Sequence, residues 1–209
     1  MRRMNKGHIR NPSVHLVSAT TTGGAGRAAV RLRQALEMHG TQTTFSVQRE
    51  PEIQTTRLRG YPLLGNPWWV SPAVSRAVTK LDGSRLGIRS LNCLPTGRLA
   101  QLNESPADVI NLHWLGSDTL SISEIGRLTK PFVWTFHDMW PFCGTEHLAP
   151  FDESARWRTG YVDQASWIDL DRWVWQQKRK HFPSKGFAVC PSQWLSNCVK
   201  DSALMHQWE

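Results

Sequence analysis

The sequence predicts an α/β fold, a Rossmann-like parallel sheet with helices on both faces. Short runs rich in β-branched and aromatic residues alternate with segments whose apolar residues recur at helical spacing. A glycine-rich turn follows the first of these runs and opens a helix. The chain shows no internal repeat and no low-complexity tract, so this alternation describes one domain of doubly wound type.

The first βαβ unit covers residues 14–48. Residues 14–19 form an apolar run, and the turn from Thr20 to Gly26 follows it. Apolar residues then fall at helical spacing, namely Ala25, Ala28, Ala29, Leu32 and Leu36. Gly40 is placed to end that helix, and residues 43–48 are rich in residues that favour strands.

The stretch from residue 50 to 102 contains five prolines and is expected to be mostly loop. One helix is predicted within it, over residues 71–81. Ser71 would cap it and Pro72 would occupy its first position. Its apolar face would carry Val74, Val78 and Leu81.

Regular elements return after residue 107. We predict strands over 108–114, 131–138 and 187–190, and helices near 123–129, from Asp169 through the basic residues 178–181, and from Gln193 with Ser192 as its cap. The segment 139–166 is irregular and aromatic. The predicted organisation is a flexible N-terminus over 1–12, a Rossmann-like domain over 13–191 and a terminal helix over 192–209.

Composition limits the class of protein. With 40% hydrophobic and 20% charged residues, the 209-residue chain can bury a core, and it contains no apolar run long enough for a transmembrane helix. The basic N-terminus lacks the apolar stretch of a signal peptide, so a cytoplasmic protein is expected. The four cysteines include no C-x-x-C pair and are expected to be structural thiols. The net charge of +8 favours anionic partners.

Ligands of open parallel sheets bind beyond the carboxyl ends of the strands. Four features of the sequence fall at such ends, which is the main argument for a site: the glycine turn after the first strand, His113, His137-Asp138 and Pro191-Ser192.

His137 is the strongest candidate, because Asp138 and a loop follow it directly. Its imidazole could donate to a sugar hydroxyl or stabilise a departing phosphate, with Asp138 tuning its charge or accepting from a hydroxyl. We therefore assign His137 and Asp138 as catalytic candidates. His113 lies in an apolar strand, where a ligand contact and a hydrogen-bonded core role are about equally expected.

The glycine turn suits a phosphate, because backbone amides at a helix N-terminus attract anions. Gly23, Gly24, Gly26 and Arg27 are the binding candidates; a tight turn that only needs positive φ is the alternative. Glu146 lies on a loop that could fold over the same edge and contact an acceptor, or remain a solvated carboxylate. No histidine spacing supports a zinc site, so no metal is expected.

The run Lys178-Arg179-Lys180-His181, which Trp173 and Trp175 precede, offers contact with an anionic membrane surface. A solvated helix face is the favoured alternative.

Three segments resemble bacterial glycosyltransferases of the large retaining family four, and most closely those of colanic acid and other exopolysaccharide biosynthesis. They are Gly23 to Ala29, Asn111 to Gly116 (N-L-H-W-L-G) and Trp134 to Gly144 (W-T-F-H-D-M-W-P-F-C-G). The C-P-S-Q-W-L segment from Cys190 to Leu195 is similar to the family's P-S-R-W-L. The resemblance spans most of the chain from Val14 onward, and H-D-M-W-P-F is its most specific part.

This resemblance implies the N-terminal, mainly acceptor-holding domain of a GT-B enzyme. The glycine loop would lie near the phosphates of a nucleotide-sugar donor, and His137 would line the reaction centre. The reaction implied is transfer of the sugar to a saccharide or lipid-linked acceptor, with retention of configuration and without a metal or other cofactor. A peripheral location at the inner membrane face is compatible with such an acceptor.

Two departures from the family pattern bear on activity. Only Cys143 stands where many relatives carry a cysteine-rich loop, and the sequence there follows the G-T-E-H subgroup. The family's donor-binding second domain has no counterpart in the 209 residues, so we expect a fragment or truncated product with little transfer activity of its own.

Two other functions remain open. The match of Gly24 to Ala29 to G-x-G-x-x-A, with Glu50 shortly past the second strand, is compatible with an NAD(P)-dependent oxidoreductase. The charge and the eleven tryptophans are compatible with a catalytically inactive basic binding module. No nucleic-acid-binding motif is present, so no nucleic acid partner is expected.

Overall fold

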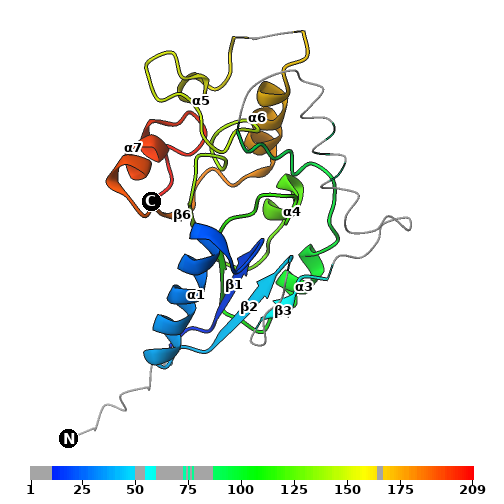
Figure 1. Ribbon diagram of the computed structural model, residues 1–209, viewed down its shortest axis with the longest axis vertical. Helices are drawn as coiled ribbons and strands as arrows, with labels where there is room; N and C mark the ends of the chain where they lie inside the picture. The colour runs from blue at the N-terminus through cyan, green and yellow to red at the C-terminus, as the bar shows by residue number, and fades with distance from the viewer. Residues whose placement is uncertain are drawn as a thin grey trace, which may run out of the picture.

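A computed structural model describes residues 11–49, 55–59, 73, 75, 77, 87–163 and 167–209. These residues contain a six-stranded sheet in the order β3-β2-β1-β4-β5-β6, in which every pair of neighbouring strands is parallel (Figure 1). The strands are β1 (Val14–Ser18), β2 (Thr43–Val47), β3 (Thr56–Arg57), β4 (Val109–Leu112), β5 (Phe132–Thr135) and β6 (Phe187–Val189). This confirms the predicted α/β fold.

The first βαβ unit is the one that the sequence predicts. Helix α1 (Gly23–Met38) links β1 to β2, and Gly40 follows its end with φ +76°, a conformation that glycine adopts without strain. The register pairs Val14 with Thr43 and Ser18 with Val47. Strand β3 was not predicted, because a two-residue strand is too short to show a period of two.

Two groups of buried side chains lie on opposite faces of the sheet. Leu16, Phe45 and Val47 pack with Ala29 of α1 on one face. On neighbouring strands Val17, Leu112 and Trp134 belong to the larger cluster, to which α3, α4 and α6 contribute. Since successive residues of a strand point to opposite faces, this alternation places helices on both sides of the sheet.

The remaining helices are shorter than the first. They are α3 (Leu99–Asn103), α4 (Ile122–Ile125), α5 (Arg156–Thr159), α6 (Leu170–His181) and α7 (Gln193–Asp201). α6 and α7 confirm the predicted helices, with Asp169 and Ser192 as side-chain caps. α4 ends four residues earlier than predicted, and α3 and α5 were not predicted. Of the helix predicted over 71–81, residues 73, 75 and 77 are described and are helical; the others, and residues 1–10 of the predicted flexible N-terminus, lie outside the described residues.

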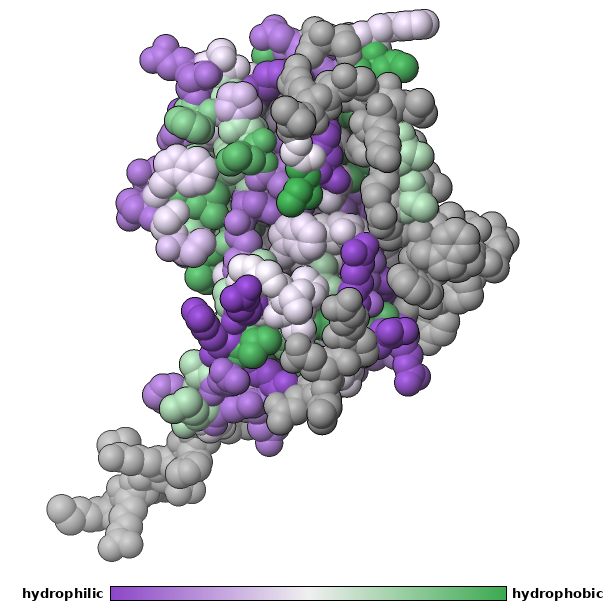
Figure 2. All heavy atoms as spheres, viewed as in Figure 1, coloured by the Kyte–Doolittle hydropathy of each residue, from purple (hydrophilic) through white to green (hydrophobic). Residues whose placement is uncertain are grey.

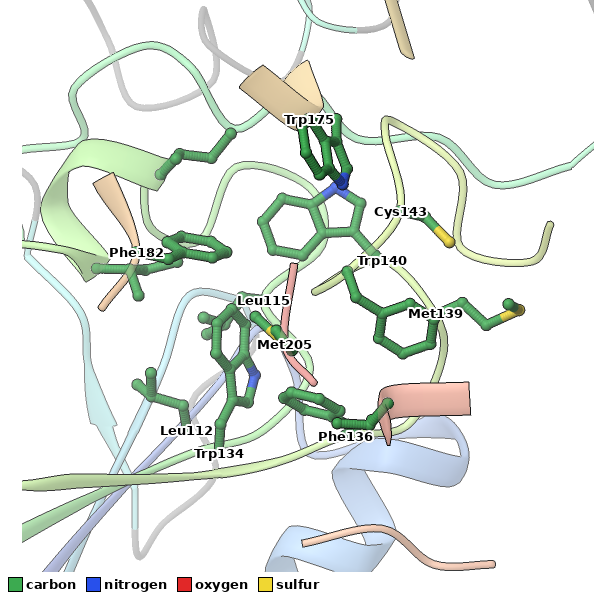
Figure 3. Packing of buried hydrophobic residues seen from close by; sticks show 14 of the residues in the cluster. Leu112, Leu115, Trp134, Phe136, Met139, Trp140, Cys143, Trp175, Phe182 and Met205 are labelled. Atoms are coloured by element: carbon green, nitrogen blue, oxygen red, sulfur yellow. The ribbon is translucent and has the colours of Figure 1, made fainter. Parts of the chain in front are cut away.

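Tryptophans fill much of the larger cluster. Trp134, labelled in Figure 3, packs edge-on against Phe136 with ring centroids 5.4 Å apart and against Trp140 at 6.2 Å. Trp157, Trp175 and Trp208 are also buried, so core packing explains about half of the eleven tryptophans. Trp167, Trp173 and Trp194 are exposed instead. On the face drawn in Figure 2, hydrophobic side chains lie scattered among hydrophilic ones.

A chain of buried hydrogen bonds crosses the sheet at His15. Its Nδ1 lies 2.8 Å from Ser105 Oγ and its Nε2 lies 2.8 Å from Ser46 Oγ, which in turn lies 2.7 Å from Thr56 Oγ1. Burial lowers the pKa of His15 to about 4, so the ring is neutral near pH 7. These hydrogen bonds tie the segment between α3 and β4 to β1, β2 and β3, so His15 has a structural role.

The four cysteines are free thiols. Within the described residues, no helix combines the length and the apolar character needed to cross a membrane.

Candidate active site

The carboxyl ends of β4 and β5 bring two predicted site residues into contact. His113 follows β4 directly and His137 lies two residues beyond β5. His113 Nδ1 lies 2.9 Å from His137 Nε2, and the two rings stack with centroids 5.2 Å apart. His113 is 1% exposed, whereas His137 is only partly buried. The pair therefore has an inner imidazole and an outer one that ligands can reach.

Both imidazoles are neutral near pH 7. Burial lowers the pKa of His113 to about 3, with His137 contributing in the same direction. Burial also lowers the pKa of His137, against the opposing effect of Asp138. Because neither ring is charged, a single proton is shared along the contact between them. Among the described residues, no hydrogen bond involves Nδ1 of His137.

Asp138 orients the aromatic wall of the site, which Trp114 and Trp140 form. Its Oδ2 accepts from Trp114 Nε1 at 2.8 Å and from His147 Nδ1 at 2.5 Å, and its Oδ1 accepts from the amide of Trp140 at 3.0 Å. No hydrogen bond of the described residues joins this carboxylate to His137. Its acceptor sites thus serve the surrounding loops, which favours a positioning role for Asp138 over the catalytic role that the sequence suggested.

His147 completes this wall and was missed as a site residue. Its Nε2 lies 2.8 Å from Ser90 Oγ, and its ring stacks on Trp140 with centroids 6.2 Å apart. The G-T-E-H segment could have indicated His147, because a histidine on the loop that follows a site strand can contact other residues of the site. Its partner Ser90 lies 57 positions away along the chain, beyond the range of any sequence pattern.

The glycine turn lies at the same edge, after β1. α1 begins at Gly23, which has φ +71°, and its N-cap Thr22 makes no side-chain hydrogen bond to the first turn. Gly23 and Gly24 are exposed, so the first amides of the helix are open to an anion. A backbone hydrogen bond from Ala19 to Trp114 O, at 2.9 Å, connects this turn with the loop after His113.

The glycines of the turn have different structural roles. A Cβ on Gly26 would lie 2.4 Å from the backbone carbon of Thr21, so Gly26 is needed for close packing of α1 on the preceding turn. A Cβ on Gly24 would meet nothing within 4 Å. Arg27 is exposed on the helix surface. No contact of the described residues joins Arg27 or the glycines to His113 or His137.

Glu146 lies among buried charged and polar groups instead of at the histidine pair. The hydroxyl of Tyr161 donates to its carboxylate, with O–O distances of 3.1 and 3.2 Å, and accepts from the amide of Gly144 at 2.8 Å. Burial, with Asp171 nearby, raises the pKa of Glu146 to about 7. The described contacts do not bring Glu146 to the open edge, where an acceptor contact was expected.

Lys178 anchors the loop that follows β5. The residue is completely buried, and its Nζ donates to the carbonyl of Trp140, to that of Cys143 at 2.9 Å and to that of Gly144 at 2.7 Å. It also lies 3.9 Å from the centre of the Trp140 ring. Burial lowers the pKa of Lys178 to about 7.

Two of the residues considered for contact with a membrane surface are buried. Lys178 and Trp175 face the core, because they occupy the buried side of α6 together with Val174. Arg179 and Lys180 are exposed, and Trp173 is 45% exposed.

Two cavities formed by described residues lie away from the histidine pair. They have volumes of about 600 and 630 Å³; the first lies beside the start of β1, and the second is lined by residues that include His15 and Arg57. Across the described ranges, no three His, Cys, Asp or Glu side chains are grouped to hold a metal ion. No protein-family model matches the chain, and no curated protein shows significant similarity to it.

Proposed function

We propose that the chain is the acceptor-side domain of a retaining glycosyltransferase that moves a sugar from a nucleotide sugar to a saccharide or lipid-linked acceptor in polysaccharide biosynthesis. The observation that carries this proposal is the neutral, partly open His137, held by His113 at the carboxyl edge of a parallel sheet. An uncharged imidazole has one donor nitrogen and one acceptor nitrogen, so it can hydrogen-bond to sugar hydroxyls. The resemblance of the segment around it, T-F-H-D-M-W-P-F, supports the same function.

In this proposal the residues have separate tasks. His137 contacts a hydroxyl of the sugar, and the exposed first-turn amides of Gly23 and Gly24 face the phosphates of the donor. Asp138 and His147 hold the aromatic wall formed by Trp114 and Trp140. The chemistry needs no metal, because the phosphate charge is met by amides and the helix dipole.

An NAD(P)-dependent oxidoreductase is less well supported. That function needs a carboxylate at the end of the second strand to hold the ribose. Gln48 stands there, and its side chain donates to Ser117 O at 3.0 Å and accepts from Thr119 Oγ1 at 2.9 Å. The candidate carboxylate, Glu50, lies outside the described residues.

We also propose contact with an anionic membrane through the N-terminal end of α6. Trp167 is 95% exposed, Ile168 65% and Trp173 45%, and the exposed Arg179 and Lys180 lie further along the same helix. Aromatic and aliphatic side chains next to cations suit the headgroup region of a bilayer. Such a contact would bring a lipid-linked acceptor to the enzyme.

Ligand-observed NMR on the isolated chain tests the function. Saturation transfer to a panel of oligosaccharides is expected, with loss of the signal in His137→Ala and retention in His181→Ala. NADH is expected to show no fluorescence enhancement. Enhanced NADH fluorescence with no saccharide contact would favour the oxidoreductase and overturn the proposal.

A further inference from the structure

Two aromatic side chains, Phe151 and Trp194, form an exposed pair on the surface of the domain. Their ring centroids lie 6.2 Å apart and their planes are inclined at 88°, so the edge of one ring faces the other ring. Phe151 is 64% exposed and Trp194 is 46% exposed. Exposed apolar side chains that stand singly are ordinary, whereas exposed apolar side chains in contact mark a binding surface. Core packing therefore does not account for this pair.

The aromatic pair belongs to the segments that follow the carboxyl ends of β5 and β6. Trp194 stands in the first turn of α7, which follows β6, and Phe151 lies on the loop that follows β5. The amide of Phe136 donates to the carbonyl of Val189 at 2.9 Å, which joins the ends of the two strands. His137 comes directly after Phe136 on the same loop as Phe151. Both features thus follow the strand ends at which open parallel sheets bind their ligands.

Two exposed amide side chains, Gln193 and Asn197, share the outer side of α7 with Trp194. Asn197 follows Trp194 by three positions, which makes the two side chains neighbours on a helix surface. Gln193 Nε2 donates to Asn197 Oδ1 at 2.9 Å. Within the part of the chain that the structure describes, no other hydrogen bond involves either side chain. An acceptor oxygen of one amide and the donor N–H groups of the other therefore stay available beside the indole ring.

The residues next to the pair in the chain carry no positive charge. Asp152 and Glu153 follow Phe151 and are exposed, and the residues on either side of Trp194 are Gln193 and Leu195. Across the described ranges, no cationic side chain stacks on either ring of the pair. An anionic membrane surface attracts aromatic residues that stand beside cations, so it does not fit this surface. A neutral ligand that combines an apolar face with hydroxyl groups does fit it.

We propose that Phe151, Trp194, Gln193 and Asn197 form a subsite for one ring of a neutral saccharide. The C–H groups on one side of a sugar ring pack on the face of an aromatic ring, where the π electrons give a negative potential. Sugar hydroxyls both donate and accept, which matches the two amides. The two aromatic planes stand nearly at right angles and form a corner that a sugar ring can enter. The subsite rests on the proposed function, because it holds a further unit of the saccharide acceptor whose reacting unit contacts His137.

Titration of the ¹⁵N-tryptophan-labelled chain with neutral gluco- and galacto-oligosaccharides tests the subsite. The indole N–H signal of Trp194, assigned by its absence in Trp194→Phe, is expected to shift saturably. Trp194→Ser is expected to weaken binding about tenfold, whereas Trp194→Phe keeps an aromatic ring and should weaken it only about twofold. The matched control is Trp167→Ser, which changes a 95% exposed tryptophan elsewhere and should leave binding unchanged. All three positions changed are at the surface, so the variants are expected to fold.

The outcomes separate this subsite from the proposed function. Oligosaccharide binding that is lost in His137→Ala and unchanged in Trp194→Ser would overturn the subsite and leave the proposed function in place. Weaker binding in Trp194→Ser with none of the expected loss in His137→Ala would support the subsite and count against the role proposed for His137. A Trp194 signal that no oligosaccharide shifts would overturn the subsite. Sedimentation provides a second check, since self-association of the wild-type chain that Trp194→Ser abolishes would assign the pair to an interface between copies and overturn it as well.

Discussion

Acidification from pH 7 to pH 5 should destabilise the fold through two buried neutral histidines, His15 and His113. Each has a folded-state pKa below its unfolded value of about 6.5, with His15 at about 4 and His113 at about 3. As the pH falls through 6.5, the unfolded chain takes up protons that the folded chain does not bind. Stability is therefore complete above this pH and declines below it, until each folded-state pKa is reached.

The size of the effect follows from these values. At pH 5 each histidine lowers the free energy of unfolding by about 2 kcal/mol relative to pH 7, and the two together by about 4 kcal/mol. Since domains are stable by only about 5–15 kcal/mol, this loss is a large fraction of the total. Both side chains are almost fully buried, at 3% and 1% exposure, so solvent screening reduces the effect little.

Urea unfolding at pH 7 and pH 5 provides the measurement. Carboxylates also titrate in this range, so the comparison is between wild type and His15→Gln, in which the drop between the two pH values should be smaller by about 2 kcal/mol. His206→Gln, at an exposed position, is the matched control and should keep the wild-type drop. Equal drops in wild type and His15→Gln would refute the reasoning. If His15→Gln does not fold, direct NMR titration of His15 decides, and a midpoint near 6.5 refutes it.

Three other predictions concern the glycine turn, the lysine anchor and the membrane contact. Gly26→Ala should lower the free energy of unfolding by about 1–3 kcal/mol, because the added Cβ would meet backbone atoms. Gly24→Ala should raise it by about 0.5–1 kcal/mol, because the space around Gly24 is open. Thermal unfolding measures both, and equal effects would contradict the packing role of Gly26. Lys178→Met should lower the free energy of unfolding by about 2–4 kcal/mol, because three carbonyls lose their hydrogen-bond donor. The control Lys180→Met should lower it by less than about 0.5 kcal/mol. If urea unfolding shows similar losses for the two variants, Lys178 does not anchor the loop. Binding to vesicles with anionic lipid should weaken several-fold when Trp167 and Trp173 are both changed to Ser, and not in Trp194→Ser; an unchanged affinity in the double variant would exclude this surface.

The sequence predicts the fold well where an element is long enough to show its period. β1, α1 and β2 could be predicted because sixteen helical residues and two five-residue strands carry clear spacing around a glycine turn. α3 and α5, with five and four residues, show no period, and their positions depend on the packing of Leu102 and Trp157. The capping box of Ser121 and Glu124 fixes the start of α4, and Gly126, which is its C-cap, marks its early end.

The contact between His113 and His137 could be anticipated for a different reason. Residues that follow parallel strands emerge at one edge, so two histidines at the ends of adjacent strands meet whenever those strands are neighbours. The hydrogen-bond partner of each polar side chain could not be anticipated from the sequence. Asp138 pairs with His147, and Lys178 reaches Trp140 across 38 positions, because tertiary packing brings these partners together.

These pairings explain how two adjacent residues of the H-D-M-W-P-F segment come to have different roles. His137 and Asp138 follow one another in a bend beyond the end of β5, and their side chains take different partners. His137 meets His113 and keeps one nitrogen open, whereas Asp138 turns to Trp114 and His147 and has its acceptor sites filled. The buried charges of Lys178, Glu146 and Asp171 lie behind the loop and make no hydrogen bond to His137. In the proposed sugar-transferring function, the neutral imidazole of His137 would select its ligand by the direction of its hydrogen bonds more than by charge.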